Sequence, residues 1–220
     1  MRRLSEEQKE AFERDGYLVI EEAVAPALLA LLREDMAAWV EESRDHSDNY
    51  GETINGKPRF DLDPGHGRDS PALRRVNAPI EVSDAYFEAA TGAYQVDAVA
   101  ELIGPDLRFH HAKINAKQPA SVTAVGFHQD FCFTPHSNDS LVTSLLAVDE
   151  MTAENGALEV LPGSDPTTAI SGARVCTSSR RRSGRTGLCR SWRSSPFRTA
   201  RTIRAGGCCT CRTSSTTSRH

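Results

Sequence analysis

The stretch Phe127-His128-Gln129-Asp130 decides both the fold and the chemistry that we expect of this 220-residue chain. We expect it to form a β-strand, in which residues two positions apart point to the same face of the sheet. His128 and Asp130 can then present an imidazole and a carboxylate to one ion. These are two of the three ligands of a 2-His-1-carboxylate facial triad, which leaves positions open on Fe(II) for oxygen chemistry. The alternative is a surface histidine near a turn aspartate.

Helix signals come first along the chain and strand signals follow. A capping box from Ser5 to Gln8 begins a helix that Gly16 ends, and Pro26 suits the first turn of a second helix with an apolar face. A third helix is expected over residues 83–103, broken near Gly92. Strands are expected over residues 17–20, 107–117, 141–148 and 158–161, the last of them after the turn at Asn155-Gly156. This order predicts an α+β fold, a jelly roll or β-barrel backed by N-terminal helices.

Residues 43–80 are polar and rich in Gly, Pro and Asp. They predict a long loop with short strands, of the kind that often forms a functional lid.

The composition changes abruptly near residue 165. Residues 1–165 hold 14 basic and all 30 acidic residues, a formal charge of 14 − 30 = −16. Residues 166–220 hold 12 Arg and no Lys, Asp or Glu, a formal charge of +12. We therefore divide the chain into one domain, residues 1–165, and a disordered Arg-rich tail, residues 166–220.

Cysteine usage changes at the same place, since Cys132 is the single cysteine before residue 165. That pattern indicates a reducing compartment without a disulfide framework. The N-terminus lacks the apolar core of a signal peptide, and no apolar run approaches the roughly 18 residues of a membrane span. A cytoplasmic protein without a membrane partner is the expectation.

Several motifs together resemble the phytanoyl-CoA dioxygenase family of Fe(II)/2-oxoglutarate oxygenases, over about residues 4–164. The matching residues are Leu4-Ser5, Glu7-Gln8, Phe12, Asp15-Gly16-Tyr17, Asn115, Lys117, His128-Gln129-Asp130 and the run from Asn155-Gly156 to Leu161-Pro162-Gly163-Ser164. The resemblance implies an incomplete double-stranded β-helix and an iron held by His128, Asp130 and a later histidine. It also implies 2-oxoglutarate as cosubstrate, with Asn115 and Thr143 as cofactor-binding contacts, and a small organic molecule as substrate.

The family pattern continues with a histidine where this chain has Asp165. Neither the third iron ligand nor the arginine that would hold the far carboxylate of 2-oxoglutarate can be placed, so we expect weak iron binding and little or no activity. Our hypothesis is that the tail is translated out of frame. Reading residues 207–212 from the third base of each codon gives an aliphatic pattern with a His or Tyr, similar to the strand near the family's distal histidine.

The tail also permits other interpretations. Cys208, Cys209, Cys211 and His220 are a poor zinc set, because structural zinc sites space their cysteine pairs differently. An Arg-rich arm that binds nucleic acid is a weaker alternative, since the tail has no Lys and no aromatic pattern. A catalytically inactive module that still binds a small molecule is the third alternative.

Several other side chains have two interpretations each. His110 and His111, expected on opposite faces of a strand, are interpreted as structural, although one could line a pocket. His66 and His136 are interpreted as loop residues rather than substrate contacts. Arg74 and Arg75 are interpreted as solvated or paired, with an anionic substrate group as the alternative, and Trp39 as a core residue.

Overall fold

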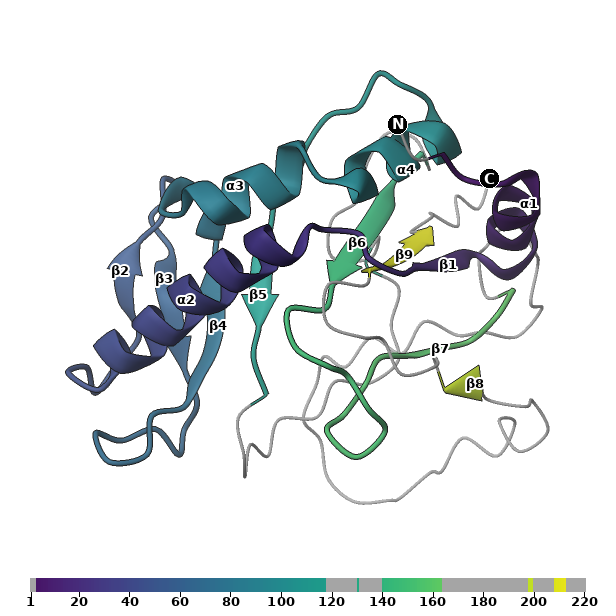
Figure 1. Ribbon diagram of the computed structural model, residues 1–220. Coiled ribbons are helices and arrows are strands. Elements are labelled where there is room, and N and C mark those ends of the chain that lie inside the picture. The colour runs from purple at the N-terminus through teal and green to yellow at the C-terminus, as the bar shows by residue number, and fades with distance from the viewer. Residues whose placement is uncertain (1–2, 118–129, 131–139, 164–197, 200–207, 213–220) are drawn as a thin grey trace, which may run out of the picture.

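The computed structural model of the chain is an antiparallel β-structure with helices over one side (Figure 1). The structure describes residues 3–117, 130, 140–163, 198–199 and 208–212. Helices α1 to α4 all precede residue 104, and the strands after that point contribute to three antiparallel sheets. The predicted α+β class is confirmed.

The helix boundaries predicted for the N-terminal part of the chain are confirmed. Helix α1 (Glu6–Asp15) begins with a complete capping box, in which Ser5 Oγ accepts from Gln8 N and the Gln8 side chain accepts from Ser5 N. It ends at Gly16, whose φ of 76° is the left-handed conformation that favours glycine. Strand β1 (Tyr17–Ile20) follows directly and alternates half-buried and buried residues. Helix α2 (Pro26–Ser43) has its proline in the first turn, as expected.

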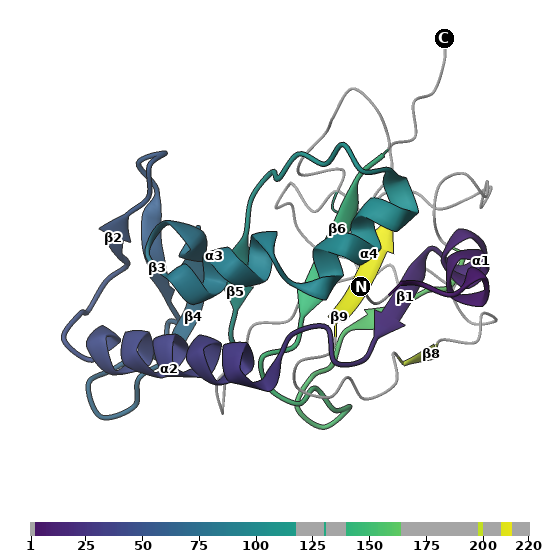
Figure 2. The same cartoon turned by 45° about the horizontal axis from the view of Figure 1, so that its top comes forward.

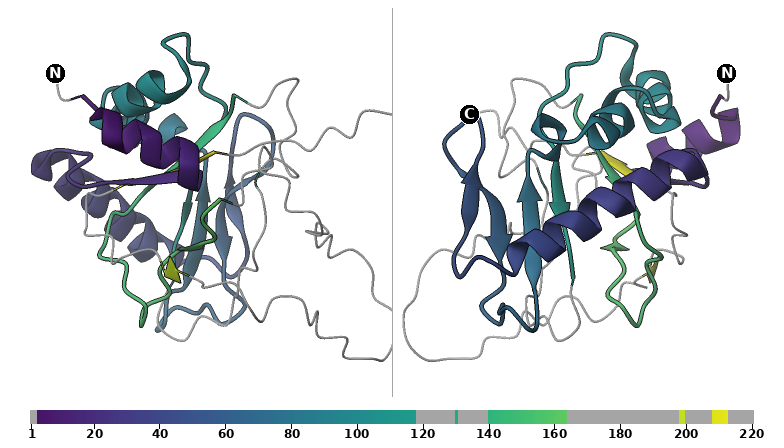
Figure 3. Two further views of the ribbon diagram at one scale, coloured as in Figure 1. Left: turned by 90° about the vertical axis from the view of Figure 1, so that its right-hand side faces the viewer. Right: turned by 60° about the vertical axis from the view of Figure 1, so that its left-hand side comes forward.

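The largest hydrophobic core lies between helices α2 and α3 and a four-stranded sheet of order β2-β3-β4-β5. Its strands are β2 (Tyr50–Glu52), β3 (Pro58–Leu62), β4 (Leu73–Asn77) and β5 (Lys113–Asn115). The two helices run across one face of this sheet in both Figure 2 and Figure 3. Trp39 of α2 is buried here against Phe60 and Tyr86, which confirms it as a core residue.

Residues 43–80 were expected to be a loop with short strands, and most of the sheet comes from them. Leu73 and Val76 are fully buried, and Phe60 is 6% exposed. The interpretation of this segment as a lid is therefore wrong. The apolar positions are few and irregularly spaced among Gly, Pro and Asp, so the sheet signal was hidden by the turns.

The third predicted helix is broken where expected. Helix α3 (Asp84–Thr91) is capped by Ser83, α4 (Tyr94–Ile103) begins two residues after Gly92, and Gly104 ends it. A short 3-10 helix, η1 (Pro79–Glu81), connects β4 to α3. The strand expected over residues 107–117 is limited to β5, because Pro105 to Ala112 pair with no strand in the described part of the chain.

A second sheet has the order β1-β9-β6, with β6 (Val142–Leu146) and β9 (Cys208–Arg212) antiparallel throughout. Strand β7 (Glu159–Val160) pairs with β8 (Arg198–Thr199). The prediction of a disordered tail is thus wrong at residues 198–199 and 208–212, which form strands. A segment of five residues can form backbone hydrogen bonds with the unpaired edges of two neighbouring strands, whatever its side chains are. The other tail residues, and with them most of that prediction, lie outside the described residues.

None of the helices within the described ranges is long and apolar enough to cross a membrane.

Candidate metal centre

The candidate site is built around a hydrogen bond between two residues that the sequence singled out separately. Thr143 Oγ1 donates to Asp130 Oδ2 over 2.9 Å, and the pair is partly buried. Asp130 is the predicted carboxylate ligand of the metal, and Thr143 is a predicted cosubstrate contact. The structure therefore brings these two side chains together although they are 13 residues apart in sequence.

Strand β6 positions Thr143. Its residues were expected to be buried on both faces, but four are half-buried and Ser144 is exposed. Ser144 and Thr143 point to opposite faces because side chains alternate along a strand. The hydroxyl of Thr143 is thus presented to one side of the sheet, where it meets Asp130.

The other predicted ligand, His128, lies outside the described residues, as does His136. Within the described ranges, no group of three or more His, Cys, Asp or Glu side chains could hold a metal ion. What can be tested is the fit of Asp130. Its carboxylate is partly buried and one oxygen is held by a hydroxyl, which is how a metal-binding carboxylate is commonly oriented. Asp130 therefore fits a role as an iron ligand.

Asn115, the second predicted cosubstrate contact, lies at the end of β5 and is exposed. Its Oδ1 accepts a hydrogen bond from Arg75 Nε over 3.3 Å. No hydrogen bond joins it to Asp130 or Thr143 among the contacts of the described residues. Strand β5 is nevertheless the strand of the four-stranded sheet that lies on the side of β6 in Figures 1 and 2.

Arg75 is the residue of this region whose role the sequence did not reveal. Its Nη1 lies 3.4 Å from Asp61 Oδ2, so the interpretation of Arg75 as a paired side chain is supported. The strand register explains both contacts, since Asp61 pairs with Arg75 and Arg75 pairs with Asn115 across neighbouring strands. Residue pairing between strands was the missing signal, and alternation within a single strand does not supply it.

The turn predicted at Asn155-Gly156 is present, but it closes no hairpin between described strands, because β7 pairs with β8 and β6 pairs with β9. Gly156 has a φ of 85°, and Asn155 Oδ1 accepts from Thr152 N over 2.8 Å. Lys117, just after β5, donates to Gly156 O over 2.7 Å. This contact joins the end of the four-stranded sheet to the family-like segment that follows the predicted metal strand.

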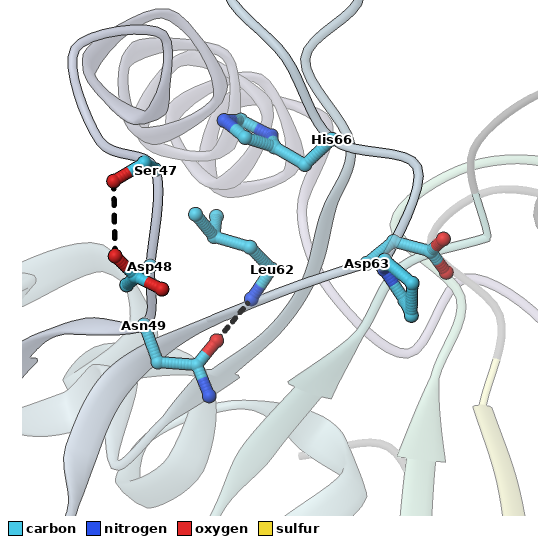
Figure 4. A pocket seen from close by; sticks show the side chains of 7 residues that line it. Ser47, Asp48, Asn49, Leu62, Asp63 and His66 are labelled. Atoms are coloured by element: carbon cyan, nitrogen blue, oxygen red, sulfur yellow. Dashed lines mark hydrogen bonds between the residues drawn. The ribbon is translucent and has the colours of Figure 1, made fainter.

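A polar pocket of about 430 Å³ lies beyond the C-terminal end of α2 (Figure 4). His66 lines it, and both ring nitrogens are engaged: Nδ1 accepts from Ala72 N over 2.9 Å, and Nε2 lies 3.0 Å from Ser43 O and 3.1 Å from His46 O. The ring is therefore a neutral Nε2–H tautomer that closes the loop, because Nδ1 must accept and the carbonyls require a donor. The structural interpretation of His66 is supported.

His110 and His111 are both exposed and lie outside any strand. Their rings meet edge to face with centroids 4.7 Å apart. The prediction that they face opposite sides is wrong, because the backbone at these residues is not extended into a paired strand. They do not contact the Asp130–Thr143 pair among the interactions of the described residues.

The fold defines the class of protein first. The structure is similar to EctD from S. alaskensis, crystallised with bound Fe, with a TM-score of 0.68 at 18% identity, over 96% of this chain and 69% of that one. It is also similar to SnoK, a non-heme alpha ketoglutarate dependent carbocyclase from nogalamycin biosynthesis, with a TM-score of 0.65 at 18% identity, over 96% and 76% of the two chains. The chain thus shares the overall fold of these two structures.

The particular family follows from the sequence comparison. The model of the family "Phytanoyl-CoA dioxygenase (PhyH)" matches residues 12–184, so the chain belongs to this family. A probable alpha-ketoglutarate-dependent hypophosphite dioxygenase of Stutzerimonas stutzeri is 31% identical over 160 residues, 73% of this chain and 53% of that protein. An L-proline trans-4-hydroxylase of Streptomyces griseoviridis is 26% identical over 160 residues, 71% and 53% of the two proteins. The chain spans about half the length of the curated relatives that it matches.

Proposed function

We propose that this chain derives from an Fe(II)- and 2-oxoglutarate-dependent dioxygenase that hydroxylates a small organic molecule. The observation that carries the proposal is the 2.9 Å hydrogen bond from Thr143 to Asp130, inside the segment that matches the family. In this proposal His128 and Asp130 hold the iron, and Asn115 and Thr143 contact 2-oxoglutarate. When bound, the iron would activate O2, the oxidant, while 2-oxoglutarate is oxidised to succinate and CO2 and takes one oxygen atom, so that the other oxygen atom is available to hydroxylate the substrate.

The part of the chain in this chemistry is positioning. A carboxylate that binds a metal must keep one rotation about its side-chain bonds, and the Thr143 hydroxyl holds Asp130 Oδ2 in place. Thr143 is itself held by β6, whose backbone pairs with β9 from Val142 to Leu146. The Thr143 hydroxyl that holds the carboxylate is therefore fixed by a paired strand.

The substrate class is proposed as a small polar molecule. The two relatives described above are named for hypophosphite and proline, which are both small and polar. The single cysteine in residues 1–165 supports a cytoplasmic enzyme.

The activity of the chain as it stands is proposed to be weak or absent. We propose that residues 1–165 are the oxygenase part and that residues 166–220 are an out-of-frame tail. The support is the absence of Lys, Asp and Glu from residues 166–220 of the sequence. The iron site would then lack its second histidine, and the cosubstrate would lack its arginine.

Succinate formation from 2-oxoglutarate with added Fe(II) tests the proposal, on this chain and on a version translated in the corrected frame. We expect turnover from the corrected version and little from the present chain, with Asp130→Ala in the corrected version as an inactive control. If the corrected version is inert and binds no iron, the assignment of the chemistry is wrong.

Stabilisation by 2-oxoglutarate without turnover would favour an inactive binding module. Salt-dependent DNA binding that is lost without residues 166–220 would favour a nucleic-acid binder.

A further inference from the structure

We infer that Arg75 is a positioning residue that fixes the side-chain amide of Asn115 as a hydrogen-bond donor for the cosubstrate. The inference rests on the proposed function and adds a residue to it. It arises from three side chains, Asp61, Arg75 and Asn115, which lie in one line across β3, β4 and β5 and are called the polar row below.

The register places the polar row on the sheet face that is turned away from the helices. Phe60, Val76 and Ile114 form the adjacent line of cross-strand partners, and they pack in the core against α2 and α3. Neighbouring residues on a strand point to opposite faces. The polar row therefore lies on the other face, with side-chain exposures of 18% for Asp61 and 31% for Arg75.

Asp61 holds the guanidinium in place. Its Oδ2 lies 3.4 Å from Arg75 Nη1, and its Oδ1 accepts from Asn77 Nδ2 over 3.4 Å. The Asp61 carboxylate thus accepts a hydrogen bond from Asn77 of β4 and also forms an ion pair with Arg75. Since Arg75 is half-buried between two strands, its Nε is directed along the row toward Asn115.

The contact of Arg75 with Asn115 settles which end of the amide faces the arginine. A guanidinium has only N–H donors, so it can meet the amide oxygen but not the amide NH₂. With Oδ1 bonded to Arg75 Nε, the two Nδ2 protons are turned away from Arg75. No hydrogen bond engages Nδ2 among the contacts of the described residues, and Asn115 is exposed. The amide is therefore oriented to donate to an oxygen acceptor, such as a carboxylate or keto oxygen of 2-oxoglutarate.

Arg74 supplies a matched control. It is the preceding residue on β4 and carries the same charge, but it lies at the register shift between Leu73 and Arg75 and has no cross-strand partner in the polar row. Its side chain makes no hydrogen bond or ion pair with a described residue. Arg74→Met therefore removes one positive charge and leaves the polar row intact, whereas Arg75→Met removes the same charge together with the contact to Asn115.

The first measurement is independent of any ligand. In the full-length ¹⁵N-labelled chain, the side-chain NH₂ resonances of Asn115, assigned by their loss in Asn115→Asp, report the orientation of the amide. We expect Arg75→Met to shift them toward the position of a freely rotating amide and Arg74→Met to leave them unchanged. Unchanged Asn115 resonances in Arg75→Met would overturn the inference.

The second measurement is the dissociation constant of 2-oxoglutarate, followed by the same spectra in the presence of Fe(II) under anaerobic conditions. Arg75→Met and Asn115→Asp are each expected to weaken binding about tenfold, because a charge-assisted hydrogen bond is lost, and the double variant is expected to be no weaker than either. Equal affinity of Arg75→Met and Arg74→Met would overturn the inference and leave the proposed function standing. If the frame-corrected version, with Arg75 and Asn115 intact, also binds no 2-oxoglutarate, the proposed function fails, and the donor role of Asn115 with it.

Discussion

Arg59 is the most deeply buried cation among the described residues. Replacing it by methionine is expected to lower the free energy of unfolding more than replacing any exposed charged residue does. Its side chain is 7% exposed. Nη1 donates to Asn77 O and Ala78 O over 3.2 and 2.8 Å, and Nη2 donates to Glu52 O and Glu81 Oε2 over 2.8 and 2.6 Å. One guanidinium thus ties the end of β2, the end of β4 and helix η1 together.

The size of the effect follows from these partners. Methionine keeps much of the apolar volume of the side chain but leaves Glu81 without its cation and removes the guanidinium donor from three carbonyls, of which Ala78 O keeps a hydrogen bond from Glu81 N. Breaking a buried ion pair from one side costs about 3–5 kcal/mol. With an m-value of about 2 kcal/mol/M, a loss of about 4 kcal/mol lowers the urea midpoint by about 2 M.

Trp39 provides the assay, because its ring centroid lies 6.0 Å from that of Phe60, the residue after Arg59. Urea unfolding is followed by tryptophan fluorescence in a Trp192→Phe background, so that Trp39 is the single reporter. Arg33→Met is the control. Its ion pair with Asp149 has side-chain exposures of 46% and 84%, and such pairs contribute under about 1 kcal/mol. Equal midpoints for the Arg59 and Arg33 variants would refute the argument that burial sets the cost.

The same pair predicts a pH dependence. The hydrogen bond from Arg59 lowers the pKa of Glu81 below its usual 4.5. A carboxyl with a lowered folded-state pKa contributes stability that is present above pH 4.5 and is lost as the pH falls through the folded pKa. The loss of stability in acid is therefore expected to be smaller in Arg59→Met. An identical acid slope in both proteins would count against the pairing.

Three further changes test single contacts. Tyr50→Phe is expected to leave stability unchanged or raise it, because the buried Tyr50 hydroxyl has no hydrogen-bond partner in the described part of the chain. Tyr86→Phe is expected to lower stability by about 1 kcal/mol, because the hydrogen bond from its hydroxyl to a backbone carbonyl is lost. A lower urea midpoint for Tyr50→Phe than for Tyr86→Phe would contradict this. Gly16→Ala is expected to cost about 1 kcal/mol in thermal unfolding, since an alanine at a φ of 76° is strained, and no change in Tm would contradict it. Thr143→Val is expected to weaken Fe(II) binding in the frame-corrected protein about tenfold and Thr143→Ser to preserve it, as titration calorimetry would measure; an unaffected Val variant would remove Thr143 from the site.

The tyrosine prediction has a consequence in alkali. Burial raises the pKa of Tyr50 to about 12. Because the folded-state pKa is raised, folding stability is unaffected by this tyrosine's titration below its ordinary pKa of 10.0 and falls as the pH rises from there through about 12. The phenolate absorbance of Tyr50 is therefore expected to appear later than that of an exposed tyrosine, and Tyr50→Phe removes the late component.

Local sequence determined the helical half of the molecule. The capping box at Ser5, the stop at Gly16 and the proline at position 26 each act within one turn of backbone, so they needed no tertiary context. The break near Gly92 was predictable for the same reason. The assignment of His128 and Asp130 as metal ligands was also a sequence inference, and it stays a prediction, since His128 lies outside the described residues and Asp130 belongs to none of the described strands.

Tertiary structure decided how the strands pair. Residues 43–80 contribute three strands because their scattered apolar residues are buried by α2 and α3, which no window of that sequence contains. The register that places Arg75 between Asp61 and Asn115 pairs segments that lie up to 40 residues apart in sequence. The hydrogen bond between Thr143 and Asp130 likewise joins residues that are 13 positions apart. A one-residue slip would turn each of these side chains to the other face. The candidate site residues were thus predicted from the sequence alone, but the side chains that they contact depend on strand pairing, which only the packed sheet determines.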